Sequence, residues 1–299
     1  MKCYIFAISA ISTLGVVEYF FPIFISNIFG HQPDQFLFQN NSIFNRVAFL
    51  FWGSHLAANL IPPVFPILIY FRSKNYKLIK NNIVLTSIIL VNLFAIYLSG
   101  NRISWLILTI YLVLILFLYP RHTLPYLKTY SLIIVTSFIV YIYSQPVEGR
   151  YMSTFYALTG KIDKKYDSSS AARMYRAKVA INSIKNKPMG SGWGSQGWVH
   201  SDILQIGASL GIITAIVFTM SQILLLGNIY KMFNKAPPAL KSGFFLCLSL
   251  LIYSFISFLL NGNILKVQTG APLFLVWAFS YTFYTHLKSL KTKTVFSNE

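Results

Sequence analysis

Charged residues are scarce in this chain, and acidic residues are the scarcest. Only 11% of the 299 residues are charged, and 7 Asp and Glu stand against 25 Lys and Arg. Because a soluble globular domain carries about 25% charged residues, this composition excludes that class. The two cysteines, Cys3 and Cys247, lie far apart in apolar sequence and imply neither a disulfide framework nor a thiolate metal site.

Long apolar runs are abundant, and they predict an all-α membrane protein. A membrane-spanning helix needs roughly 20 mostly apolar residues. About eight stretches qualify, and we predict a single integral-membrane domain over residues 1–299. The predicted spans cover residues 4–28, 47–71, 83–100, 103–119, 130–147, 203–230, 242–260 and 270–287.

The distribution of Lys and Arg predicts the orientation. Thirteen of these residues fall on the side that holds both termini, whereas three, Arg46, Arg102 and Lys266, fall in the opposite short loops. Because short cytoplasmic loops carry the excess of basic residues, we expect both termini in the cytoplasm. The other nine lie in a large outer loop, residues 145–199, between spans five and six. Over the whole chain, the net charge of +18 is too scattered for a nucleic-acid patch and suits loops beside anionic lipid or phosphate groups.

A short helix is predicted inside this outer loop. Serines at Ser168–Ser170 are a start signal, and Pro188 is a stop signal. We expect one apolar stripe to pack against the rest of the protein, and it consists of Met174, Ala177, Ile181 and Ile184.

Arg173 and Arg176 are three residues apart and therefore share another face of this helix. Two guanidinium groups on one ridge suit a phosphate or pyrophosphate, because each offers a fork of hydrogen-bond donors and keeps its charge. The alternative is that both side chains are solvated or touch lipid headgroups.

A glycine-rich segment follows, with glycines at positions 190, 192, 194 and 197. Glycines permit tight turns and a close approach of backbone amides to an anion. Trp193 and Trp198 are candidates for stacking on a sugar ring, although tryptophans also anchor proteins at membrane interfaces.

His200 stands where the chain re-enters the membrane. Beside a helix N-terminus the cationic form of histidine is disfavoured, so we expect a neutral imidazole that is able to accept a proton. The alternative is a structural histidine at the end of a span.

Taken in order, these residues resemble a known family. The run Ser99-Gly100-Asn101-Arg102 at a hairpin tip, Arg173 fifteen residues before Pro188, the run Pro188-Met189-Gly190-Ser191-Gly192, and then His200-Ser201-Asp202-Ile203-Leu204-Gln205 with Leu210-Gly211 are similar to the bacterial O-antigen ligase and O-antigen polymerase family. The clear resemblance covers residues 99–211. These are membrane glycosyltransferases that use glycans carried on undecaprenyl pyrophosphate.

The resemblance implies roles for three residues. It assigns Arg102 and Arg173 to the pyrophosphate of the lipid donor and His200 to the base that activates the acceptor hydroxyl. Arg176 is added from helical spacing alone. Asn101 stands where serine is common and Ser201 where asparagine is common, and the chain has fewer spans than is usual in the family, which leaves open a reduced or inactive member.

No metal or cofactor is expected. Undecaprenyl pyrophosphate is already a good leaving group, so only a base is required. The outer acidic residues contain neither a DxD pair nor a close Glu pair, and they are Asp34, Glu148, Asp163, Asp167 and Asp202. This pattern argues against a metal-dependent transferase and against a two-carboxylate glycosidase.

These observations predict a glycosyltransferase of the bacterial inner membrane with a periplasmic active site and a metal-independent inverting mechanism. Polymerase is the first expectation, with another lipid-linked repeat unit as acceptor. The alternatives are a ligase, with lipid A core as acceptor, and a non-catalytic flippase for the same lipid-linked sugar. The expected partners are the glycan donor, the acceptor, the lipid bilayer and a chain-length regulator protein.

Overall fold

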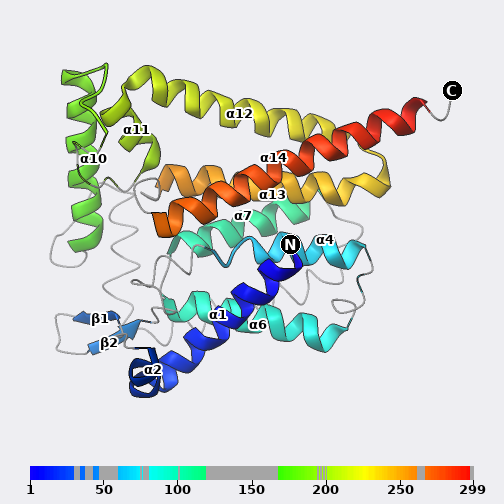
Figure 1. The fold of residues 1–299 in the computed structure, drawn as a ribbon, viewed down its shortest axis with the longest axis horizontal. Coiled ribbons are helices and arrows are strands. Elements are labelled where there is room, and N and C mark those ends of the chain that lie inside the picture. Colours follow the sequence, from blue (N-terminus) through cyan, green and yellow to red (C-terminus); the bar gives the residue numbers. More distant parts are fainter. Residues whose placement is uncertain are drawn as a thin grey trace. The chain divides into compact units, whose positions relative to one another are not determined.

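The computed structural model describes residues 1–29, 34–37, 43–46, 60–74, 76, 81–99, 102–118, 168–193, 195, 197, 199, 201–260 and 267–296. Within these residues, all elements except one short hairpin are α-helices (Figure 1). The predicted helical fold class is therefore confirmed. The hairpin pairs β1 (Asp34–Leu37) with β2 (Ile43–Arg46) in antiparallel register, and no pattern in the sequence had indicated it.

The chain forms two compact units. The first comprises Met1–Ser137, Met232–Tyr253 and Trp277–Glu299, and the second comprises Phe138–Lys231 and Ser254–Val276. Some long helices contribute residues to both units, because a boundary between the units falls inside them.

Three of the described helices are long and apolar enough to cross a membrane: α1 (Lys2–Phe20), α12 (Ile212–Asn234) and α13 (Pro238–Leu260). They overlap predicted spans one, six and seven. Helices α6 (Asn82–Ser99) and α7 (Arg102–Leu118) agree with spans three and four to within one residue at each end. The chain therefore has the helices of a membrane protein.

The remaining predicted spans are covered in part. Helix α4 (Val64–Ser73) lies in the second half of span two, and α14 (Val267–Phe296) contains span eight. Span five and the first half of span two lie outside the described residues, so the number of about eight spans stays a prediction.

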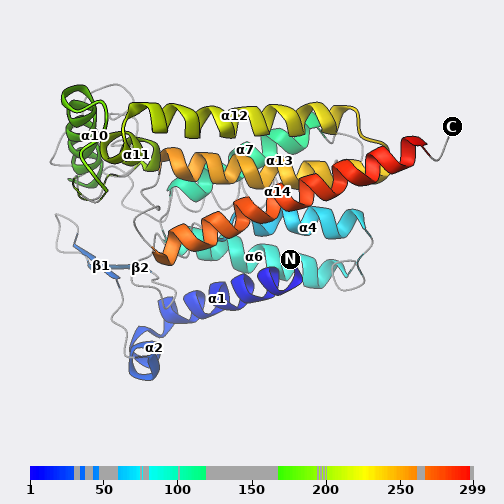
Figure 2. The ribbon, with the colours of Figure 1, turned by 45° about the horizontal axis from the view of Figure 1, so that its top comes forward.

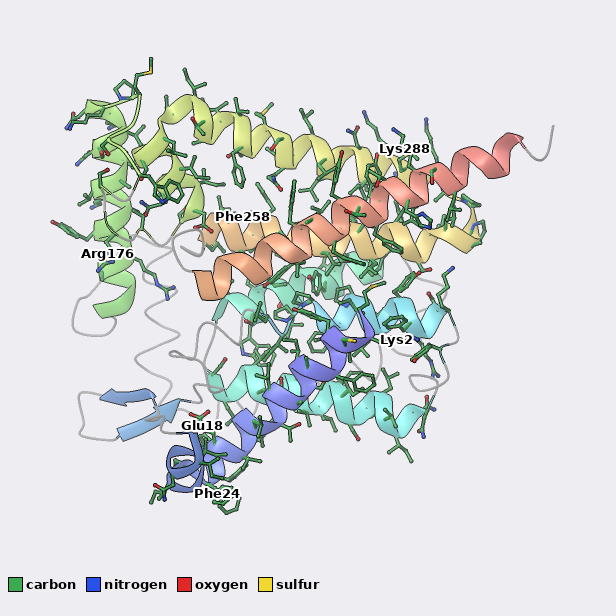
Figure 3. The ribbon with its side chains drawn as sticks, in the orientation of Figure 1. Lys2, Glu18, Phe24, Arg176, Phe258 and Lys288 are labelled. Atoms are coloured by element: carbon green, nitrogen blue, oxygen red, sulfur yellow. The ribbon has the colours of Figure 1, made fainter. Side chains whose placement is uncertain are left out.

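The first predicted span is wrong as one continuous helix. Helix α1 ends at Phe20, and α2 (Pro22–Phe29) begins two residues later. Pro22 lacks the N–H that a continuing helix would use, and it suits the first position of a new helix. The buried Glu18, labelled in Figure 3, consequently lies in the last turn of α1 and not in the middle of a long span.

The sixth predicted span is also divided. Its first part is α11 (Asp202–Leu210), and α12 follows after Gly211. Gly211 has a φ of 99°, which a residue inside an α-helix does not adopt. The break has a specific hydrogen-bonding cause, which is described below with the site.

A buried polar contact joins α1 to α6 in the first unit. The Ser12 hydroxyl donates to Asn92 Oδ1 at 2.9 Å, and Asn92 Nδ2 donates to Ser9 Oγ at 3.0 Å. Asn92 and Ser12 are both inaccessible to solvent. Interhelical hydrogen bonds of this kind help membrane helices to associate, because the hydrophobic effect does not favour helix–helix contacts over helix–lipid contacts.

Candidate functional site

The predicted outer helix exists as α10 (Ser168–Asn186). It runs crosswise to α12 in both ribbon views (Figures 1 and 2). A small apolar cluster joins it to α11, and the members are Ala180, Ile184, Val199, Leu204 and Ala208. The helix that carries Arg173 and Arg176 is thus packed against the helix that begins directly after the His200 segment.

The predicted packing stripe of α10 is confirmed at Ile184 and wrong at Met174 and Ile181. Met174 and Ile181 are 39% and 41% exposed, whereas Ala180 is fully buried. The packed face holds Arg173, Ala177, Ala180 and Ile184, at intervals of four, three and four residues. Small residues suit this face because α11 comes close. A Cβ on Gly207 of α11 would lie 2.9 Å from Ile184 Cδ1.

The two arginines that were predicted to share a ridge differ in exposure. Arg173 is partly buried on the packed face, and its Nε atom is inaccessible to solvent. Arg176, labelled in Figure 3, is exposed. The basic residues of α10 are unopposed within the helix itself, since its sequence contains no Asp or Glu.

The glycine-rich segment after α10 fills the break between α11 and α12. In a continuous helix, the Ile212 amide would donate to the Ala208 carbonyl. Here it donates to the Pro188 carbonyl at 2.9 Å, and the Ala208 carbonyl accepts from the Ser191 amide at 3.1 Å and the Ser191 hydroxyl at 2.8 Å. Groups of the glycine-rich segment thus replace the helical hydrogen bonds that are lost at the break. An irregular backbone in a membrane protein requires such replacement partners.

Two glycines allow this exchange because the two backbones touch. A Cβ on Gly190, whose φ is 92°, would lie 2.5 Å from the Ser209 carbonyl oxygen. A Cβ on Gly211 would lie 2.9 Å from the Met189 carbonyl oxygen. Real Cβ atoms do not approach main chain so closely, so side chains at both positions are excluded.

The expectation that this segment offers its amides to an anion is wrong for four of the described ones, because the Gly190 and Ser195 amides donate to the Lys187 and Gly192 carbonyls and two more bond to α11. The Ser191 amide is bonded to Ala208, and the Gly192 amide donates to the Ser209 carbonyl at 3.0 Å. The glycines at 190 and 211 therefore serve the contact between backbones. The segment fixes α10 to the α11–α12 break, and the arginines remain the candidates for holding phosphate.

The entry into α11 is tied down on both sides of His200. Val199 is 3% exposed, and its amide donates to Gln205 Oε1 at 2.8 Å. Ser201 is the N-cap, because its hydroxyl accepts from the Leu204 amide at 3.4 Å. Asp202, in the first turn, is fully buried, and a carboxylate there is favoured by the helix dipole.

The other candidate residues are placed as follows. Arg102 is the first residue of α7, in the first unit, whereas α10 and α11 belong to the second. Trp193 is 55% exposed in the turn after α10. His200 and Trp198 lie outside the described residues. In the part of the chain that the structure describes, no group of three His, Cys, Asp or Glu side chains gathers as a metal site would need.

Comparison with known proteins bears on this region directly. Residues 86–219 match the family described as O-antigen ligase. The family resemblance is confirmed. The matched part of the chain runs from α6 into α12 and contains every candidate site residue. No curated protein and no solved structure gives a significant match. The likeness to O-antigen ligases therefore rests on this family match and on the motifs it encloses.

Sequence reasoning assigned no site role to two polar residues of this region, Asp202 and Gln205, which are 0% and 1% exposed. Both stand in the run that resembles the family, but as single polar residues at the start of an apolar stretch they had no distinguishing pattern. Gln205 did carry a usable signal, since it is a polar residue within an apolar run. A buried side-chain amide needs hydrogen-bond partners, so such a residue indicates a polar contact.

Proposed function

We propose that the chain is a surface-polysaccharide polymerase that transfers a glycan from undecaprenyl pyrophosphate to a sugar hydroxyl of another lipid-linked repeat unit. The observation that carries this proposal is the packing of α10 on α11 within the family match. Arg173 lies on the packed face of α10, and the His200 segment leads directly into α11. The match to O-antigen ligases supports activity of the ligase and polymerase type.

The donor pyrophosphate is held by Arg173, with Arg102 and Arg176 as further ligands in this proposal. Ala180 and Val199 belong to the same apolar cluster. Arg173 precedes Ala180 by seven residues, or about 10 Å along the helix axis. A donor phosphate bound at Arg173 would thus be within a short distance of the segment that carries His200. The partly buried guanidinium strengthens a charge-assisted contact, because the local dielectric is lower than in water.

His200 acts as the base in the proposed reaction. The oxygen of the acceptor hydroxyl forms a bond to the anomeric carbon of the donor while its proton passes to the imidazole. The bond from that carbon to the phosphate oxygen breaks, and undecaprenyl pyrophosphate leaves with the electron pair, so the anomeric configuration inverts. A positioned base accelerates such a step roughly 10²- to 10⁴-fold. Trp193 and Trp198 are the proposed glycan contacts.

A lipid-linked donor determines which membrane and which partners the proposed enzyme needs. A polyprenyl donor requires the lipid bilayer, and we place the chain in the bacterial inner membrane with the site on the periplasmic face. A chain-length regulator protein is a further proposed partner. The three membrane-length helices support the membrane assignment.

A ligase is the second candidate, and the description of the matching family favours it. It would use the same donor and the same base but would hand the finished glycan to lipid A core. Deletion of the gene followed by gel analysis of surface glycans separates the two functions. A polymerase mutant makes a single repeat per lipid, whereas a ligase mutant accumulates lipid-carried polymer.

Purified chain tests the residue roles directly. Undecaprenyl-pyrophosphate-linked repeat units from a deletion strain serve as substrate. We expect His200→Ala to lower turnover at least roughly 10²-fold and Arg173→Ala to weaken donor use. Lys178→Ala, which removes an exposed charge from the same helix, is the matched control. Normal turnover of the His200 and Arg173 variants would refute the assigned roles, and lipid flipping without new glycosidic bonds would indicate a flippase.

A further inference from the structure

Gln205 is an unusual residue for its position in α11. It is 1% exposed, and its neighbours Ile206, Gly207 and Ala208 are buried as well. An amide buried in this way costs free energy unless its polar atoms are hydrogen-bonded. An apolar residue of similar length would fill the same space without that cost, so the amide group itself calls for an explanation.

Both ends of the amide have partners. Gln205 Oε1 accepts from the Val199 amide at 2.8 Å, and Gln205 Nε2 donates to Ser209 Oγ at 3.2 Å. The Ser209 carbonyl in turn accepts from the Gly192 amide at 3.0 Å. One buried side chain therefore links the residue before His200 to the glycine-rich segment that fills the helix break.

The main chain on the other side of His200 is fixed to the same helix. The Ser201 carbonyl accepts from the Gln205 amide at 2.9 Å, and the Ser201 hydroxyl caps the Leu204 amide. Gln205 thus contacts both neighbours of His200, with its side chain on Val199 and its backbone on Ser201. The Val199 side chain belongs to the same apolar cluster as Ala180 of α10. Val199 and Ser201 are therefore both hydrogen-bonded to Gln205.

We propose that Gln205 is a positioning residue for His200. This inference rests on the proposed function, because it assigns the Val199 hydrogen bond a purpose in placing the base. A misplacement of a catalytic group by about 1 Å is able to cost roughly 10²-fold in rate. The hydrogen bond fixes Val199, the residue directly before the proposed base, to α11.

The decisive variant is Gln205→Met, which keeps the length of the side chain and removes the acceptor. Purified full-length chain is assayed with undecaprenyl-pyrophosphate-linked repeat units. We expect kcat to fall roughly 10- to 100-fold while KM for the donor stays within about twofold, because the donor arginines are unchanged. Gln222→Met is the matched control. It replaces a second buried glutamine, ten residues into α12, and should leave kcat unchanged.

Gln205→Glu tests whether the acceptor is the reason. The carboxylate keeps an oxygen for the Val199 amide, and the Ser209 hydroxyl is able to donate to the other oxygen. We expect it to recover most of the kcat lost in Gln205→Met. A normal kcat in Gln205→Met overturns the inference, and so does an equal loss of kcat and donor affinity in both variants, which would be a general structural effect.

Two further variants complete the design. If Gln205→Met fails to accumulate in membranes, Ser209→Ala decides, since it removes only the hydrogen bond that orients the amide. A drop in kcat of about threefold then supports the inference and an unchanged kcat overturns it. His200→Ala separates this inference from the proposed function. If that variant is active, the base assignment itself is wrong. If it is inactive while Gln205→Met is normal, only the positioning role is lost.

Discussion

Two buried side-chain amides, one in each unit, serve different kinds of backbone. Asn92 lies between two regular helices and bonds Ser12 and Ser9 of α1 while also donating to the Ile88 carbonyl at 2.8 Å. Gln205 instead bonds the main-chain amide of Val199, which belongs to no helix. The Asn92 amide joins two helices, whereas the Gln205 amide supplies a hydrogen-bond acceptor to the main chain of an irregular segment.

Glycines differ between the two units in the same way. Gly243 of α13 lets a side chain come close, since a Cβ there would lie 2.8 Å from Leu287 Cδ1 of α14. Gly190 lets main chain approach main chain at Ser209. A leucine end is able to rotate away, but a carbonyl in the last turn of a helix is not. The glycine-rich segment after α10 should therefore tolerate substitution at Gly190 less well than α13 does at Gly243.

The largest expected effect tests this difference at Gly190. Gly190→Ala combines a left-handed φ with a main-chain clash, and we expect a loss of about 2–5 kcal/mol in folding free energy. Gly192→Ala is the matched control, because its φ of 95° is almost the same but nothing lies within 4 Å of its Cβ. We expect about 1–2 kcal/mol there. Denaturation in detergent micelles measures both.

Equal losses in the two glycine variants would contradict the argument. They would mean that the left-handed conformation alone accounts for the glycine at position 190, and that the contact with Ser209 and Gly211 contributes nothing.

The next effect concerns the amide in the bundle. Asn92→Leu removes hydrogen bonds to two serines and leaves the buried Ser12 hydroxyl to find another partner. Hydrogen bonds between membrane helices contribute about 0.6–1.7 kcal/mol, so we expect a destabilisation of that size. Asn228→Leu, at an exposed position of α12, is the control and should change stability little. A larger loss than in Gly190→Ala would reverse the comparison between the two units.

A smaller effect is expected at the N-cap of α11. Ser201→Ala removes the hydroxyl that accepts from Leu204, and the bond is long at 3.4 Å. We expect about 0.5–1 kcal/mol, at the low end for a lost cap. Ser221→Ala removes an exposed hydroxyl that donates to the Phe218 carbonyl and caps nothing, so thermal unfolding of the two variants isolates the cap. Identical melting curves would exclude a role for the Ser201 hydroxyl.

The sequence predicted those features that depend on local pattern. Helices α6 and α7 were placed to within one residue, because long apolar runs with a two-residue interruption leave few alternatives. The limits of α10 followed from serines at its start and Pro188 beyond its end. The family resemblance followed from the order of short motifs, which the match over residues 86–219 bears out.

Features that depend on distant contacts were missed. The break at Gly211 lies inside an unbroken apolar run, and its cause is a bond from Ile212 to Pro188, twenty-four residues earlier in the chain. The packed face of α10 was misplaced because the rule puts large apolar residues inside, whereas α11 presents Gly207 and Ala208 and accepts Ala180 instead. The convergence of Arg102, Arg173 and His200 in one pocket stays a prediction.

The smallest expected effect returns to glycine within the bundle. In a helix interior, replacing glycine by alanine gains up to about 1 kcal/mol in helix propensity. Gly227→Ala in α12 should show that gain, since nothing lies within 4 Å of its Cβ. Gly243→Ala should show less, because Leu287 must shift to accept the methyl group, and we expect a deficit of about 0.5–1 kcal/mol between the two variants. Denaturant titration of both proteins in the same micelle measures it. A loss of stability in Gly243→Ala as large as that in Gly190→Ala would contradict this argument. It would mean that the Leu287 side chain moves no more easily than the Ser209 carbonyl.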